Sequence, residues 1–291
     1  MFGVCGGEIF PKPYISFQER AMTAIAAGKT RTGIIIAADG RVHIDDESRA
    51  AHPEWAKYER ENARKIFEII RPDAQMAYAM AGSLIDIDLN FDLRYKAQEV
   101  AQLLLTESFS GNAKYLPRFM DELARTTTAA KHFPTGNGRG DDGWLISNVV
   151  IAGYFKGESI IAYASLYHDG NSAYCKEIIP LNIPALYGSG EVASDMYDIN
   201  YLENPYLIPK ADSNFSAFLV RLTSDPSLDE MESLCTGYIK ACKTDFAQKK
   251  YPSCKIIGGD IHVAEINQHG FRWIIEPKEK KRLSGELSRG Q

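Results

Sequence analysis

The feature that most limits the fold is a continuous apolar segment, residues 33–38, which reads Gly-Ile-Ile-Ile-Ala-Ala. A strand with one face in water alternates polar and apolar residues, whereas a strand covered on both faces is apolar throughout. Asp39 and Gly40 follow at once, and this pair is typical of a hairpin turn, so residues 41–44 are expected to return as a second strand. The segment therefore predicts a covered β-sheet that contains a hairpin.

Strand-like and helical segments then recur along the chain in a regular order. After a run that begins at Thr23, further strands are expected at residues 65–70, 76–81, 149–153, 159–166, 173–179, 256–266 and 271–275. Apolar residues at helical spacing predict two helices within residues 84–123, one after Gly190 and one through residues 231–242. Several strand connections are too short for a crossover, which requires antiparallel pairing. The pattern predicts an α+β fold with helices on the outer faces of antiparallel sheets.

The chain divides into one large domain and two flanking segments. Residues 1–22 contain several glycines and prolines without periodicity, which predicts an N-terminal extension or propeptide. Residues 23–276 form the predicted domain, in which the charged stretch 45–64 is expected to be an exposed, partly helical insertion. Residues 277–291 are expected to be a flexible tail.

Composition excludes several classes of function. The net charge is −5 and the basic residues are spread along the chain, so there is no basic field for nucleic acid and no basic helix for a membrane surface. No apolar run reaches the roughly 18 residues of a membrane span, and the first residues lack the continuous apolar stretch of a signal peptide. The five cysteines are scattered and the histidines form no spaced pair, so neither disulfides nor a metal site is expected. We expect a cytoplasmic protein without a cofactor.

The segment from Thr23 to Arg41 resembles the beginning of a mature β subunit of the proteasome. That family starts with a threonine, places an aspartate sixteen residues later and an arginine two residues beyond it. Thr23, Asp39 and Arg41 occupy these positions without a gap.

The resemblance continues through most of residues 23–275. With residues 45–64 taken as an insertion, Lys65 matches the family's lysine, and Met80-Ala-Gly82 matches its turn into the first helix. Tyr187-Gly-Ser-Gly190 resembles the entry to the third helix. The resemblance implies the four-layer αββα sandwich of N-terminal nucleophile hydrolases.

The resemblance also implies a set of catalytic roles. Thr23 would be the nucleophile, and its own α-amine would take the hydroxyl proton, because a threonine hydroxyl needs an adjacent base. Lys65 would favour the developing alkoxide and Asp39 would hold Lys65, while the N–H of Gly82 would stabilise the oxyanion. Ser189 would support the amine.

Two positions depart from the family pattern. Met22 precedes Thr23 where self-cleaving precursors carry glycine, so removal of an initiator methionine at Met22 is an alternative way to expose Thr23. Gly258 follows Ile257 where the family has an aspartate and a serine, and the nearest upstream aspartate is Asp245. For this reason Ser189 is preferred to Asp245 as support for the amine.

These observations predict a threonine hydrolase that cleaves peptide or amide bonds and self-associates into a homo-oligomer. Peptides or unfolded proteins are the expected substrates. One alternative is a non-catalytic, proteasome-like ring or scaffold subunit in which Thr23 stays internal. A further alternative is an amidase of the same fold that acts on a small molecule.

Overall fold

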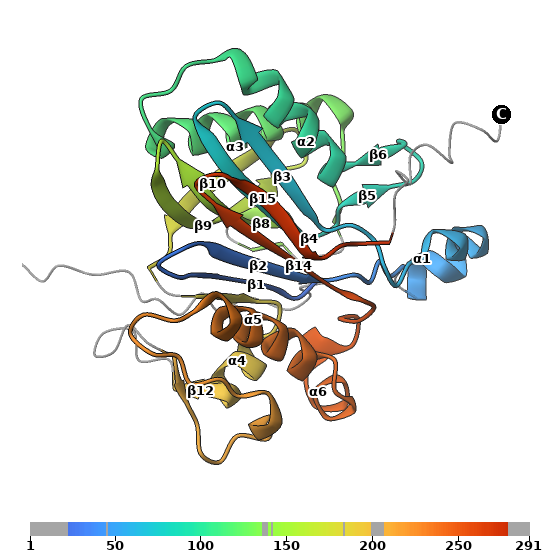
Figure 1. The fold of residues 1–291 in the computed structure, drawn as a ribbon. Helices are drawn as coiled ribbons and strands as arrows, with labels where there is room; N and C mark the ends of the chain where they lie inside the picture. The colour runs from blue at the N-terminus through green and yellow to red at the C-terminus, as the bar shows by residue number, and fades with distance from the viewer. Residues whose placement is uncertain are drawn as a thin grey trace, which may run out of the picture.

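The computed structural model describes residues 23–44, 46–135, 139–140, 142–182, 184–198 and 207–278. The predicted N-terminal extension and all but the start of the predicted tail lie outside the described residues. Two antiparallel sheets dominate the described part, and Figure 1 shows them stacked between two groups of helices. The predicted α+β fold is confirmed.

The first sheet contains the apolar segment with which the sequence analysis began. Its strands, in spatial order, are β11 (Ala185–Tyr187), β1 (Ile25–Lys29), β2 (Ile34–Asp39), β14 (Ile261–Asn267) and β15 (Gly270–Ile275). All six residues of β2 are buried, as their apolar run predicts for a strand covered on both faces.

The second sheet holds the longer hairpins of the central part of the chain. Its strands, in spatial order, are β10 (Ala173–Pro180), β9 (Glu158–His168), β8 (Gly143–Phe155), β4 (Ala74–Gly82) and β3 (Ile66–Arg71), with β7 (Arg139–Gly140) paired to β8. Two small two-stranded sheets join β5 (Ile85–Asp86) to β6 (Phe91–Asp92) and β12 (Tyr197–Asp198) to β13 (Ile208–Pro209).

Helices cover the outer face of each sheet. On the second sheet these are α2 (Leu93–Leu103) and α3 (Asn112–Ala130); on the first sheet they are α4 (Gly190–Met196), α5 (Leu228–Cys242) and α6 (Asp245–Lys250). A capping box between Ser227 and Glu230 begins α5, and the side chain of Asp92 caps α2. The order helix, sheet, sheet, helix is the predicted four-layer sandwich (Figure 1).

Three apolar clusters separate these four layers. One lies between the second sheet and its helices, one between the first sheet and its helices, and the third between the two sheets. The third cluster is rich in alanine, including Ala38, Ala79 and Ala264. Small side chains on both inner faces let the sheets pack closely, so the polar residues at the ends of these strands are brought together.

Two local predictions are wrong. Residues 41–44 do not return along β2, because β1 and β14 already occupy its two sides; only Val42 forms a bridge, to Arg60. Residues 84–92 are not helical, since they form the small β5–β6 pair and the helix starts only at Leu93. The insertion 45–64 is partly helical as predicted, with α1 (Asp46–Ala51) followed by a 3-10 turn at Pro53–Tyr58.

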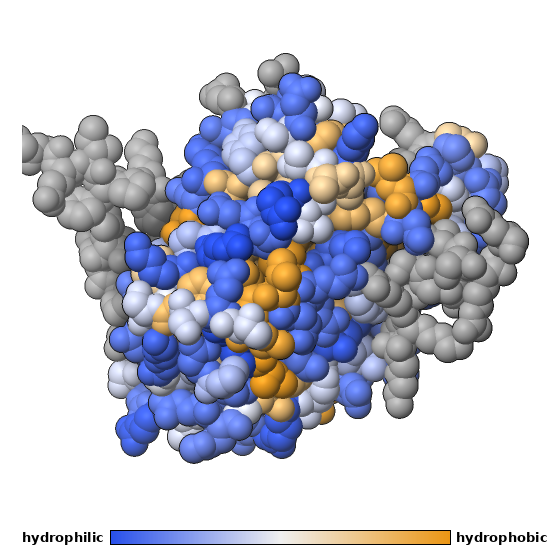
Figure 2. All heavy atoms as spheres, turned by 90° about the horizontal axis from the view of Figure 1, so that it is seen from above, coloured by the Kyte–Doolittle hydropathy of each residue, from blue (hydrophilic) through white to orange (hydrophobic). Residues whose placement is uncertain are grey.

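The surface is mixed in character. Figure 2 shows hydrophobic side chains gathered in a band across an otherwise largely hydrophilic face. The exposed large hydrophobic residues of the described chain are Ile70, Leu89, Leu103, Ile208, Phe246 and Ile275. None of the described helices has the length and apolar character needed to cross a membrane.

Candidate active site

Three polar side chains that are far apart in the sequence meet between the ends of the two sheets. The Lys65 ammonium donates to Thr23 Oγ1 at 2.8 Å and to Asp39 Oδ1 at 3.4 Å. Thr23 and Lys65 are each 2% exposed, and Asp39 is fully buried. Buried polar groups are normally paired in this way. Three of the predicted site residues therefore form one hydrogen-bonded cluster.

Strand pairing fixes two of these residues relative to each other. In the antiparallel register of β1 and β2, Ile25 lies opposite Ala38, so Ala24 lies opposite Asp39. The N–H of Ala24 donates to Asp39 Oδ1 at 2.8 Å, and the N–H of Asp39 donates to the Ala24 carbonyl at 3.1 Å. Thr23 is the next residue before Ala24. Asp39 is therefore held beside Thr23 by the sheet itself.

Lys65 comes from the opposite sheet. It directly precedes β3, and its side chain spans the space between the sheets to reach the first one. Burial lowers the pKa of Lys65 from its usual 10.5; the Asp39 carboxylate opposes this effect, whereas Arg94 and Arg41 add to it. A lysine with a lowered pKa gives up its proton more readily, which is common where lysine takes part in acid–base chemistry.

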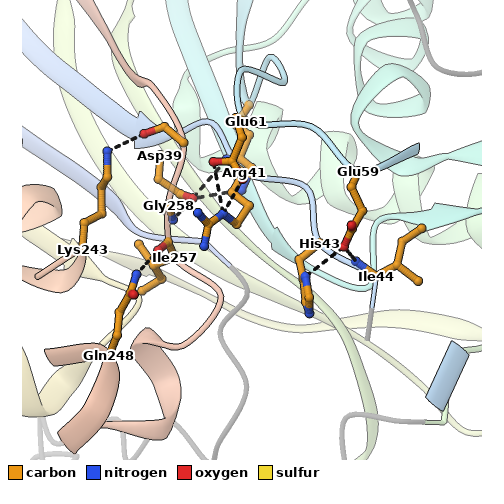
Figure 3. Close-up of polar contacts among 12 residues, drawn as sticks. Asp39, Arg41, His43, Ile44, Glu59, Glu61, Lys243, Gln248, Ile257 and Gly258 are labelled. Atoms are coloured by element: carbon orange, nitrogen blue, oxygen red, sulfur yellow. Dashed lines mark hydrogen bonds and ion pairs between the residues drawn. The ribbon is translucent and has the colours of Figure 1, made fainter. Parts of the chain in front are cut away.

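The second oxygen of Asp39 anchors a loop from the far end of the chain. Asp39 Oδ2 accepts from the N–H of Gly258 at 3.0 Å and from the N–H of Arg41 at 3.3 Å. Figure 3 shows this side of the cluster, with Arg41 also paired to Glu61. Four donors in all, two on each oxygen, therefore fix the position of the Asp39 carboxylate.

The Gly258 loop packs too closely for side chains. A Cβ on Gly258 would lie 2.3 Å from the Arg41 guanidinium carbon, and Gly259 has φ of +73°, a conformation that glycine adopts without cost. Gln248 donates to the Ile257 carbonyl at 3.0 Å, and Lys243 donates to the Gly259 carbonyl (Figure 3). Gly258 was singled out from the sequence, but its contact with Asp39 was not predicted.

Ser189 follows a glycine that packs against the Thr23 backbone, but its own hydroxyl bonds other residues. The neighbouring Gly188 is so close that a Cβ there would lie 2.8 Å from Ala24 Cα and 3.0 Å from the Thr23 carbonyl oxygen. The Ser189 hydroxyl caps α4 through Val192 N–H and hydrogen-bonds Glu191 Oε2 at 3.0 Å; Ser253 donates to it at 3.0 Å. The alternative Asp245 is the first residue of α6, where Thr244 is the cap.

Gly82 is the last residue of β4, in the same sheet as the strand that follows Lys65. Its φ is +129°, and a Cβ would lie 2.4 Å from the Ile146 carbonyl oxygen, so no other residue fits without a shift of the backbone. In the ladder it lies opposite Ser147 of β8. The turn that the resemblance implied at this position therefore has a structural requirement for glycine.

Sequence analysis missed one buried residue of this region. His262 in β14 is 1% exposed and lies opposite Ala38, the neighbour of Asp39. Burial lowers its pKa to about 4; Asp260 opposes this effect and Lys65 adds to it. Only strand pairing could have identified this residue, because it is 223 positions from Asp39 in the sequence. No group of three or more potential metal ligands is present in the described parts of the chain.

Comparisons with known proteins give structural matches only. No protein-family model and no curated protein matches the sequence. A (Gly-1) mutant of Anbu from Hyphomicrobium sp. strain MC1 is similar at 13% identity with a TM-score of 0.52, over 92% of both chains. Anbu from Yersinia bercovieri, described as an ancestral beta-subunit, is 14% identical over 92% of both chains with a TM-score of 0.49. A helical assembly of the Anbu complex from Pseudomonas aeruginosa is 12% identical over 91% of both chains, also with a TM-score of 0.49.

These findings correct the assignment made from the sequence. The similar structure with a TM-score above 0.5 is of an Anbu protein, and Anbu is distinct from the proteasome β subunits that the sequence resembled. Membership of the N-terminal nucleophile hydrolases is likewise not established, because Thr23 follows Met22 in the chain and no N-terminal nucleophile is shown. At this level of identity the comparison shows the fold, which is like that of Anbu.

Proposed function

We propose that the protein is a threonine hydrolase that cleaves peptide or amide bonds with Thr23 as its nucleophile. The observation that carries this proposal is the 2.8 Å hydrogen bond from the buried Lys65 ammonium to Thr23 Oγ1. A threonine hydroxyl in a sheet ordinarily bonds to backbone or to water. Placing a lysine on it, with that lysine held by a buried aspartate, favours the alkoxide form of the hydroxyl.

The reaction follows from these roles. Thr23 Oγ1 attacks the carbonyl carbon of the scissile amide, and its proton passes to the α-amine of Thr23 in a chain that starts at this residue. The Lys65 ammonium stabilises negative charge on Oγ1 before the attack, and Asp39 keeps Lys65 in place. The tetrahedral intermediate then releases the amine, which takes up the proton, and leaves an ester on Thr23. Water hydrolyses the ester and restores the hydroxyl.

Two further residues are assigned supporting roles. The backbone N–H of Gly82 is proposed to stabilise the oxyanion, and the positive φ that only glycine tolerates there supports a specialised turn. Ser189 is proposed to support the α-amine of Thr23. The neighbouring Gly188 packs against the Thr23 carbonyl, which supports this role, although the Ser189 hydroxyl bonds Glu191 and Ser253.

The experiment that tests the proposal combines the N-terminal sequence of the natively expressed protein with labelling by a β-lactone or epoxyketone. The proposal expects a chain that starts at Thr23 and is labelled there, and no labelling of Thr23→Ala. Thr32→Ala is the matched control, because Thr32 is an exposed threonine nine residues away and should leave labelling intact. If Met22 stays attached to Thr23 and nothing is labelled, the protein is instead a non-catalytic, proteasome-like scaffold subunit.

We also propose that the protein associates with copies of itself. Six large hydrophobic side chains are exposed in the described chain, and a hydrophobic band crosses the face in Figure 2. Exposed apolar surface of this kind often marks contact sites between proteins. Light scattering tests this directly. A monomer that is labelled at Thr23 would favour an amidase acting on a small molecule over a peptidase built from several subunits.

A further inference from the structure

His262 is a buried side chain for which the structure provides no hydrogen-bond partner. It is 1% exposed, and neither Nδ1 nor Nε2 of its ring is hydrogen-bonded to any described residue. A buried polar group without a partner destabilises a fold, and native proteins satisfy such groups with protein or water. The imidazole of His262 therefore requires a partner other than the described side chains.

The ring of His262 faces the layer between the two sheets. Alternate residues of a strand face the same side, and Ala264 of β14 belongs to the apolar cluster between the sheets, as does Ala38 opposite His262. A Cβ on Gly40 would lie 3.0 Å from the ring carbon Cε1. The ring is thus directed into the layer that Lys65 crosses to reach Thr23.

The Lys65 ammonium has one N–H group that could supply the hydrogen bond that His262 lacks. An ammonium group carries three N–H bonds, of which one goes to Thr23 Oγ1 and one to Asp39 Oδ1. The third N–H has no hydrogen bond to another described residue. Both side chains reach the end of β2: Lys65 bonds Asp39, and a Cβ on the next residue, Gly40, would lie 3.0 Å from His262 Cε1. The Lys65 charge also contributes to the lowered pKa of His262, after burial as the main cause.

We propose that one enclosed water joins the third N–H of Lys65 to a ring nitrogen of His262, which makes His262 a positioning residue for Lys65. The imidazole is neutral at pH 7 and has one nitrogen free to accept a hydrogen bond. The water accepts from Lys65 and donates to His262, so both unpaired groups are satisfied at once. With its third donor held, the ammonium keeps its other two directed at Thr23 and Asp39. The role of His262 in catalysis rests on the proposed function, whereas the water-mediated hydrogen bond between Lys65 and His262 does not.

The charged groups around the pair are few and come from separate elements. Lys65 is affected by Asp39 at the end of β2, by Arg41 after it and by Arg94 of α2; His262 is affected by Asp260 and Lys65. Replacing His262 leaves the first three of these groups in place. A change in the titration of Lys65 after such a replacement therefore reports on His262.

The test measures the titration midpoint of Lys65 by NMR of protein labelled at lysine side chains, with the signal assigned by its absence in Lys65→Met. A hydrogen bond to the ammonium stabilises the charged form, so His262→Phe should lower the midpoint, whereas His262→Gln, which can still accept, should largely retain it. His168→Phe is the matched control, because His168 is fully buried but hydrogen-bonded to the Pro134 carbonyl. This control should leave Lys65 unchanged.

An unchanged Lys65 midpoint in a folded His262→Phe protein would overturn the proposal. If that variant does not fold, the wild-type ring is measured directly by ¹⁵N NMR. The accepting ring nitrogen should give the shift of a hydrogen-bonded nitrogen and should move towards that of a free one in Lys65→Met; a free shift in the wild type overturns the proposal. Labelling of Thr23 is measured in parallel. A protein that shows the Lys65–His262 coupling but no labelling would refute the hydrolase and leave this inference intact.

Discussion

Among the described residues, two ion pairs have both partners buried, and they differ in the basic residue. Asp92 and Arg94, 3% and 1% exposed, pair at the start of α2, with Arg94 Nε 3.0 Å from Asp92 Oδ1 and Nη2 2.8 Å from Oδ2. Asp39 and Lys65 are equally buried, but Lys65 contacts its carboxylate at 3.4 Å and makes its shorter bond to Thr23. Arg94 makes two close bonds to its carboxylate, whereas Lys65 divides its bonds between a carboxylate and the Thr23 hydroxyl.

The difference follows from the chemistry of the two side chains. The planar guanidinium of arginine matches a carboxylate with two parallel bonds and stays charged, whereas the ammonium of lysine is a point charge whose pKa responds to burial. Arg94 also donates to the Arg64 carbonyl at 3.0 Å, directly before Lys65 in the chain. The Asp92–Arg94 pair therefore stabilises the segment before Lys65, and the Lys65 cluster is the part to which we assign the proposed chemistry.

The largest effect on stability is expected from breaking the buried pair of Asp92 and Arg94. Asp92→Asn keeps the size of the side chain but leaves the Arg94 charge buried without its acid, which costs about 3–5 kcal/mol of unfolding free energy. Chemical denaturation measures this loss. Glu99→Gln on the same helix is the control, because Glu99 forms an exposed pair with Lys96 and should change little. Equal effects of the two variants would show that the buried pair gives no special support.

Changing the reactive pair should affect labelling more than folding. Lys65→Met removes the ammonium at Thr23 while keeping an unbranched side chain, and the labelling rate of Thr23 should fall about 100- to 1,000-fold, as when one stabilising donor is lost from an active site. Lys65→Arg keeps the charge but not the geometry and should not restore the rate. Rate measurements at matched folded fractions separate the two effects. Full labelling of Lys65→Met would remove Lys65 from the mechanism.

The pH dependence of stability should report on the surroundings of Lys65, because burial and the nearby Lys65 charge keep His262 neutral. Its pKa falls from 6.5 to about 4 in the folded state. Between pH 6.5 and 4 this histidine is protonated in the unfolded chain but stays neutral in the folded chain. The free energy of unfolding therefore falls by up to about 3 kcal/mol as the pH drops through this range. His262→Phe should lose less stability across this range. Parallel curves for the two proteins between pH 7 and 4 would contradict a buried neutral histidine.

The smallest effect should come from the edge of the cluster. Ser189→Ala removes the cap of α4 and should cost about 1 kcal/mol of stability. Labelling of Thr23 should fall by less than about tenfold, because the Ser189 hydroxyl bonds Glu191 and Ser253 instead of Thr23. Thermal unfolding and labelling rates give both numbers. A fall in the labelling rate as large as that of Lys65→Met would show that Ser189 acts directly on Thr23.

Much of the fold could be predicted from local pattern. The buried strand β2 was evident because six consecutive apolar residues require cover on both faces, and α5 because its apolar residues recur at helical spacing. The hairpin after Asp39 was predicted wrongly. A turn dipeptide indicates only that the chain can turn, and whether a strand pairs there depends on which other strand, here β14, occupies the position.

The candidate site, like the fold, could be predicted from the sequence only in part. The resemblance to the proteasome β-subunit pattern pointed to Thr23, Asp39 and Lys65, and these three side chains do meet in the structure. Three contacts came to light in the tertiary structure alone: Gly258 binds Asp39, the Ser189 hydroxyl bonds Glu191 and Ser253, and His262 lies in the same layer as Lys65. The physical reason is that these contacts depend on which strands lie side by side. That order is set by burial over the whole chain and is not encoded in any short stretch of it.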